Sequence, residues 1–139
     1  MTMPAGRYYI GDLCYVMHPE WDEFCALTIK DHQCLDGEFT LADGRRFASF
    51  GTAYGDGTYR SNIGTEHCVD AGLIGCIRVE DINDTTYDAE RIQELGAIVE
   101  FTEPFEVSED QGLIRFGHVQ IETAGGYDEE EEEYEYDEE

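Results

Sequence analysis

Three aspartates in glycine-rich turn segments are the residues whose type and spacing best suit chemistry. They are Asp12, Asp56 and Asp70, and Tyr59 follows the second of them closely. Carboxylates that converge at one end of a small sheet can serve as general acid and base, or bind a small ligand. Asp beside Gly is also ordinary turn chemistry, because Asp hydrogen-bonds nearby backbone and Gly adopts positive φ. We favour the turn interpretation, and we predict that the chain is not an enzyme.

Other catalytic and metal-binding patterns are weak. No serine or cysteine lies in a recognisable nucleophile motif, and the four histidines are scattered. Cys14 and His18 are four residues apart, and His67, Cys68 and Cys76 form a loose group. Structural zinc usually needs two closely spaced ligand pairs, and neighbours on a strand point to opposite faces. We therefore predict no catalytic residue, no metal site and no cofactor.

The charge is strongly one-sided. The chain has 33 acids and eight bases, a net charge of -25, and residues 127–139 hold ten of the acids. The rest of the chain is therefore acidic too. Such a surface repels nucleic acids and anionic membranes and attracts basic proteins, so we expect neither direct nucleic-acid binding nor membrane association. The alternative is that the charge only keeps a small protein soluble. Seven of the eight bases are arginine, which suits internal pairing with carboxylates.

The chain ends in YDEEEEEYEYDEE, which we predict to be a disordered acidic tail. Like charges at this density repel one another, and the segment cannot form a core. Its tyrosines could stack on flat groups of a partner that normally receives bases. The predicted contact residues of the tail are Asp128, Glu129, Glu130, Glu131, Glu132, Glu133, Tyr134, Glu135, Tyr136 and Asp137.

Two helices should position these groups. Residues 19–28 have Pro19 at an expected first helical position and acids in the first turn. The spacing there predicts one buried stripe, formed by Trp21, Phe24, Cys25 and Thr28. A second, short helix is predicted over residues 85–96, where Ala89, Ile92 and Leu95 share a face and Gly96 ends the helix.

The remaining elements are predicted to be strands. RYYIGDLCYVM reads as two strands broken at Gly11-Asp12, and Asp-Gly at 36–37, 43–44 and 56–57 predicts three hairpins with type I′ turns. Further strands flank Ala71-Gly72 and fill residues 97–122, with a turn at 110–112. The predicted fold class is α+β: a meandering antiparallel sheet or partial barrel, with one N-terminal helix and one short later helix. We expect a single domain over 1–126, followed by the tail 127–139.

The chain is expected to be cytoplasmic. Its five cysteines are odd in number and show no C-x-x-C spacing, which favours reduced thiols. Its start lacks the basic flank and apolar run of a signal peptide, and no stretch approaches the ~18 apolar residues of a membrane span.

Several motifs resemble those of a known group. They are GRYYIGDLCYVM (6–17) with the W-x-x-F-C helix after it, FGTAYGDGTYRSN (50–62) and VDAGLIG (69–75). In this order they resemble an uncharacterised family of small phage and bacterial proteins with G-x-Y-x-I-G-D-P-C-Y, G-D-G-x-Y and V-D-A-G motifs. Leu13 replaces the expected proline, and the acidic tail is not part of the pattern. The family has no named activity, so the resemblance implies only a phage or bacterial accessory origin, and the host cytoplasm if phage-encoded.

Three functions fit these observations. The first is an acidic accessory protein that binds and blocks a basic host protein, one that handles nucleic acid or acts in host defence, by nucleic-acid mimicry. The second is a small-ligand-binding protein or enzyme that uses the turns around Asp12, Asp56, Tyr59 and Asp70. The third is a structural component of a virion. We favour the first, and the oligomeric state is left open.

Overall fold

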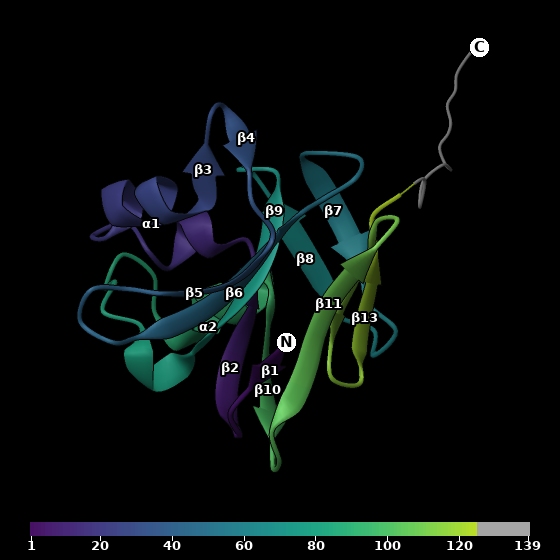
Figure 1. Ribbon diagram of the computed structural model, residues 1–139. Coiled ribbons are helices and arrows are strands. Elements are labelled where there is room, and N and C mark those ends of the chain that lie inside the picture. The colour runs from purple at the N-terminus through teal and green to yellow at the C-terminus, as the bar shows by residue number, and fades with distance from the viewer. Residues whose placement is uncertain (125–139) are drawn as a thin grey trace.

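Within residues 1–124, antiparallel sheets and two α-helices make up the architecture, and no sheet closes into a barrel (Figure 1). The computed structural model describes residues 1–124. The predicted α+β class is confirmed. No helix in this part of the chain is long and apolar enough to cross a membrane. The predicted domain boundary at 126 and the tail 127–139 lie outside the described residues.

A five-stranded sheet forms the centre, in the order β10-β2-β9-β6-β5. The strands are β2 (Gly6–Gly11), β5 (Gly37–Thr40), β6 (Arg46–Gly51), β9 (Leu73–Arg78) and β10 (Ala97–Phe101). Successive side chains of a strand point to opposite faces. Tyr8 and Ile10 accordingly pack into one hydrophobic cluster, and Tyr9, paired with Ile77, packs into another. Both faces of the sheet are therefore covered.

A second sheet and a two-stranded ribbon cover the first face. The sheet has the order β1-β11-β12-β13, and β7 pairs with β8. The strands are β1 (Thr2–Met3), β7 (Gly57–Arg60), β8 (Glu66–Val69), β11 (Phe105–Asp110), β12 (Leu113–Phe116) and β13 (Val119–Glu122). Figure 1 shows β11 and β13 on the side of the molecule away from α1. Apolar side chains of this sheet and ribbon complete the first core, among them Tyr59, Val107, Ile114, Phe116 and Ile121.

Helices cover the other face. They are α1 (Trp21–Thr28), α2 (Ala89–Leu95) and the short 3-10 helices η1 (Leu13–Tyr15) and η2 (Val79–Asp81). Phe24 and Thr28 of the predicted α1 stripe are buried, and so are Ile92 and Leu95 of α2. The helix begins at Trp21 with Glu20 at the N-cap, so the expectation that Pro19 opens it was wrong. The helix α2 ends at Gly96, as expected.

Only one of the three Asp-Gly pairs closes a hairpin. Residues 43–44 lie between the paired strands β5 and β6, but β4 (Gln33–Cys34) and β6 do not pair with the strands that follow them, β5 and β7. The hairpins predicted at 36–37 and 56–57 were therefore wrong. The connection between β3 (Ile29–Lys30) and β4 has positive φ at both central residues, Asp31 (52°) and His32 (65°), as a type I′ turn requires.

The second strand predicted after Gly11-Asp12 was also wrong. The chain turns there into η1, because the Asp12 side chain caps the turn by accepting a hydrogen bond from Cys14 N at 2.9 Å. This change of direction brings residues 13–18 beside the turn between β8 and β9, and it creates the site described next.

Candidate functional site

Asp12 ties two distant motif segments together. Its side chain has no exposed surface, and its Oδ2 accepts hydrogen bonds from Asp70 N (2.7 Å) and Ala71 N (2.6 Å). With the Cys14 bond on Oδ1, the carboxylate satisfies three backbone N–H groups. Burying a carboxylate is costly unless it is hydrogen-bonded in this way. Asp12 is therefore a structural clamp, and the GDLCY and VDAG segments meet through it.

A pocket of about 410 Å³ opens beside this clamp. It is lined by Cys14, Tyr15, His18, Trp21, Asp70, Ala71 and Tyr87. The Tyr15 hydroxyl donates to Asp70 Oδ2 at 2.7 Å, and the Tyr15 and Tyr87 rings pack edge to face with centroids 6.2 Å apart. The pocket therefore combines three aromatic residues with one exposed carboxylate.

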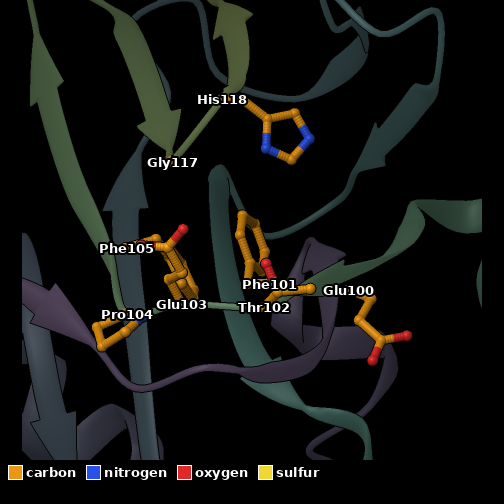
Figure 2. Close-up of a pocket in the computed structure, with 8 residues that line it drawn as sticks. All are labelled: Glu100, Phe101, Thr102, Glu103, Pro104, Phe105, Gly117 and His118. Carbon is orange, nitrogen blue, oxygen red and sulfur yellow. The ribbon is translucent and has the colours of Figure 1, made fainter.

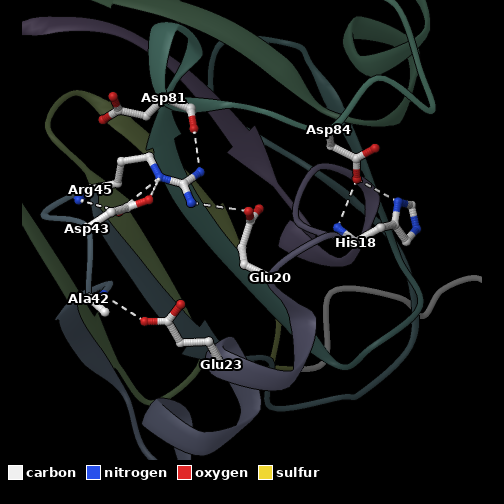
Figure 3. Close-up of polar contacts among 8 residues, drawn as sticks. All are labelled: His18, Glu20, Glu23, Ala42, Asp43, Arg45, Asp81 and Asp84. Atoms are coloured by element: carbon white, nitrogen blue, oxygen red, sulfur yellow. Dashed lines mark hydrogen bonds and ion pairs between the residues drawn. The ribbon is translucent and has the colours of Figure 1, made fainter.

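His18 is oriented by a buried aspartate (Figure 3). Asp84 Oδ2 accepts from His18 N at 2.8 Å and lies 2.6 Å from His18 Nδ1, while Oδ1 accepts from Thr86 N. Burial raises the pKa of Asp84, but hydrogen bonds from Thr86 and His18 outweigh it and leave the pKa below its ordinary value. The His18 side chain is 49% exposed, so Asp84 fixes one ring nitrogen while the ring still lines the pocket.

Cys14 is not an activated nucleophile in this setting. Burial first, and then the nearby charge of Asp12, raise the pKa of the Cys14 thiol far above its ordinary value. Burial and the hydrogen bond to Asp70 likewise raise the pKa of the Tyr15 hydroxyl. Thiolates, not thiols, attack electrophiles. The pocket thus opposes formation of negative charge and does not support Cys–His nucleophilic catalysis.

The four residues predicted to form a ligand site come together only in part. Asp12 and Asp70 are adjacent, and Asp70 lines the pocket. Asp56 is exposed in the loop before β7 and is not among the lining residues. Tyr59 is 2% exposed and lies in the first core, with its hydroxyl donating to Gly55 O at 2.7 Å. The predicted contact residues Asp128–Asp137 lie outside the described part of the chain.

Sequence reasoning missed the contributions of Trp21, Tyr87 and Asp84 to this pocket. The helical spacing predicts Trp21 only as part of the buried stripe, and in the structure it also stacks on Phe24. Asp84 is 66 residues from His18 and stands in no motif, so nothing in the sequence signals the pair. Tyr87 precedes α2 and gave no signal of its own.

A second pocket, of about 280 Å³, lies at the far end of β10 (Figure 2). Phe101 and Phe105 stack with ring centroids 3.7 Å apart, and the His118 ring lies 5.5 Å from Phe101. Glu100 and Glu103 line the same hollow. Both phenylalanines are buried in the core, and the exposed residues around the hollow are Glu100, Thr102, Glu103, Pro104, Gly117 and His118.

No cluster of three or more potential metal-ligating side chains occurs within residues 1–124. No family model, curated protein or solved structure matches the chain. The resemblance to small phage and bacterial proteins therefore stays a prediction, and function has to be inferred from geometry and charge.

Proposed function

We propose that this protein binds a basic partner, of the kind that handles nucleic acid or acts in host defence, and blocks the basic surface of that partner. The observation that supports the proposal is the distribution of charge on the described surface. Residues 1–124 carry 23 acids and eight bases, and sixteen of those acids are exposed. The net negative charge is therefore presented to solvent.

Half of the bases are neutralised within the chain. Arg45 pairs with Glu20 and Asp43 and also donates to Asp81 O, as Figure 3 shows. Within residues 1–124 the other three paired arginines form the ion pairs Arg46–Glu38, Arg60–Glu66 and Arg91–Glu94. These pairs consume few carboxylates, and the expectation of internally paired arginines is confirmed. The side chains of eight exposed acids have neither a hydrogen bond nor an ion pair within residues 1–124: Asp22, Asp31, Asp56, Glu80, Glu90, Glu100, Glu103 and Asp110.

One end of the second sheet is acidic where the chain runs on toward its terminus. Glu109 and Asp110 end β11, and Glu122 ends β13 opposite Leu113. The Glu109 and Glu122 side chains cap backbone N–H groups of Gly112 and Ala124, so both carboxylates are held at this end. The ten acids of residues 127–139 follow soon after in sequence. The acids at this end of the sheet and those of residues 127–139 would then contact the same partner.

Carboxylates can replace phosphates in contacts with a partner's Arg and Lys. Charge-assisted hydrogen bonds of this kind are roughly twice as strong as neutral ones, and complementary charge speeds encounter. Attraction between exposed charges is screened within about 8 Å at physiological ionic strength. Binding should therefore weaken steeply as salt is added.

Affinity capture from host lysate tests the proposal. Three baits are compared at low and high salt: the intact chain, a chain ending at Gly126, and an equal-length chain whose ten tail acids are replaced by Gln and Asn. We expect a basic protein on the intact bait, binding weakened about ten- to hundredfold on both altered baits, and loss at high salt. The captured protein should lose its own nucleic-acid binding when this chain is added.

The three baits separate the possible failures. If no basic protein is captured at low salt, or if a captured protein still binds nucleic acid fully, the proposal is wrong. If the bait with the neutral tail captures no basic protein at all, the binding depends on residues 127–139 alone and residues 1–126 contribute none of it. Equal binding by the intact and neutral-tail baits would show that tail charge plays no part.

A further inference from the structure

The pocket beside the Asp12 clamp has the composition of a site for an organic cation. Tyr15, Trp21 and Tyr87 supply three electron-rich rings, and Asp70 supplies a carboxylate. Cations bind aromatic rings within about 6 Å of the ring centroid. A carboxylate in reach adds charge-assisted hydrogen bonds. We name this arrangement the aromatic cage. We infer that the cage binds the guanidinium group of an arginine side chain from the basic partner, an inference that rests on the proposed function.

The electrostatics of the cage select for positive charge. Asp12 lies behind the pocket and Asp70 on its wall, and Asp84 is held against His18 at its edge. Burial first, and then the charges of Asp12, Asp70 and Asp56, raise the pKa of the Cys14 thiol, in keeping with these nearby carboxylates. A neutral or anionic ligand gains nothing from them, whereas a cation does.

The carboxylate of Asp70 is free on one side and fixed on the other. Its Oδ2 accepts from the Tyr15 hydroxyl, and its Oδ1 has no hydrogen bond within the described part of the chain. Its backbone N–H is clamped by Asp12. A guanidinium can bond a carboxylate with two parallel N–H groups and stack on a ring at once, which an ammonium cannot. This geometry favours arginine over lysine.

One guanidinium of this chain already lies near a ring of the cage. The guanidinium carbon of Arg91 lies 6.0 Å from the centroid of the Tyr87 ring, while Arg91 also pairs with Glu94 at 2.7 Å. A ring of the cage therefore accepts a guanidinium from this chain's own helix α2. The pocket volume of about 410 Å³ leaves room for a second, incoming side chain.

Trp21 gives the cage a built-in reporter, because it is the only tryptophan in the chain. The probe is N-acetyl-L-arginine amide, titrated at pH 8, where its guanidinium is charged. Its uncharged isostere, N-acetyl-L-citrulline amide, is the matched control ligand. We expect a saturable change in Trp21 fluorescence with arginine at millimolar concentration, and binding about tenfold weaker or absent with citrulline.

Two variants locate the binding in the pocket. Asp70→Asn removes the charge but keeps the backbone bonds to Asp12, and Tyr87→Leu removes a ring from a separate segment. Each should weaken arginine binding about five- to tenfold. Asp110→Asn, the same change on β11 of the other sheet, should leave it within twofold. Circular dichroism checks that each variant is folded.

The results are decisive in either direction. Equal binding of arginine and citrulline, no saturable binding, or equal losses in Asp70→Asn and Asp110→Asn would each overturn the cage. Because the probe is a small molecule, such a failure leaves the capture experiment to decide the proposed function separately. Conversely, arginine binding with no captured partner would support the cage and remove the protein-blocking role.

Discussion

Replacing Asp12 by asparagine should destabilise the fold strongly, although only one atom changes. The carboxylate is fully buried and accepts three backbone hydrogen bonds, from Cys14, Asp70 and Ala71. An asparagine has one acceptor oxygen, so its NH₂ group must face at least one of these N–H donors. A hydrogen bond to a charged group contributes about 1.5–3 kcal/mol, and an unsatisfied buried donor costs a similar amount. We expect a loss of about 3 kcal/mol in the free energy of unfolding.

Urea unfolding, followed by both far-UV circular dichroism and Trp21 fluorescence, measures this loss. The matched control is Asp36→Asn, because Asp36 is exposed and its side chain accepts one backbone hydrogen bond, from Gly51 N at 2.9 Å. The control should lose less than about 1 kcal/mol, the usual contribution of an exposed hydrogen bond. If Asp12→Asn also loses less than 1 kcal/mol, the carboxylate is not the clamp inferred from the structure.

Three further outcomes follow from buried groups. Burial lowers the pKa of His67 to about 4, so between pH 6.5 and pH 4 only the unfolded chain binds the proton. The free energy of unfolding should therefore fall by about 3 kcal/mol as the pH is lowered from 6.5 to 4. A His67→Gln variant, measured by urea unfolding, should lose this pH dependence. Gly75→Ala places a methyl group against the backbone of the neighbouring strand β6 and should lower the free energy of unfolding by about 3 kcal/mol. The control Gly51→Ala meets only ordinary contacts and should lower it by less than about 1 kcal/mol. Equal losses in the two variants would contradict the close packing at Gly75. Exposed Cys34 should react with a disulfide reagent at once. Cys76 is fully buried, and burial raises the pKa of its thiol, so it should react only on unfolding. A Cys34→Ser variant should lose the fast phase of the reaction.

Local patterns predicted the helices well. The spacing of Phe24 and Thr28 places them on one face whatever the rest of the chain does, and both are buried in α1. The same holds for Ile92 and Leu95 in α2, whose N-cap is Asp88 with its side chain accepting from Arg91 N. These features depend only on neighbours within one or two turns, which is why the sequence reveals them.

Strand pairing could not be predicted in the same way. Asp56-Gly57 has the composition of a hairpin turn, yet β6 pairs with β9 because apolar residues on both of its faces need the centre of the sheet. The flanking strand β7 instead pairs with β8 and buries Tyr59 against the second sheet. Pairing is decided by contacts between residues far apart in sequence, and turn composition carries no information about them.

Distance along the sequence also explains which residues of the pocket could be predicted and which could not. Asp12 and Asp70 were marked by their turns, but their roles differ: the Asp12 side chain holds the backbone of Asp70, and the Asp70 side chain faces the pocket. An aspartate that stabilises a turn and an aspartate that faces a ligand look alike in sequence. The two substitutions distinguish them, because Asp12→Asn should lower stability and thereby disturb the cage, whereas Asp70→Asn should lower cation binding in a fold of nearly unchanged stability. If Asp70→Asn instead loses as much stability as Asp12→Asn, its loss of cation binding reflects the fold, and the Asp70 carboxylate belongs to the clamp and does not contact the cation.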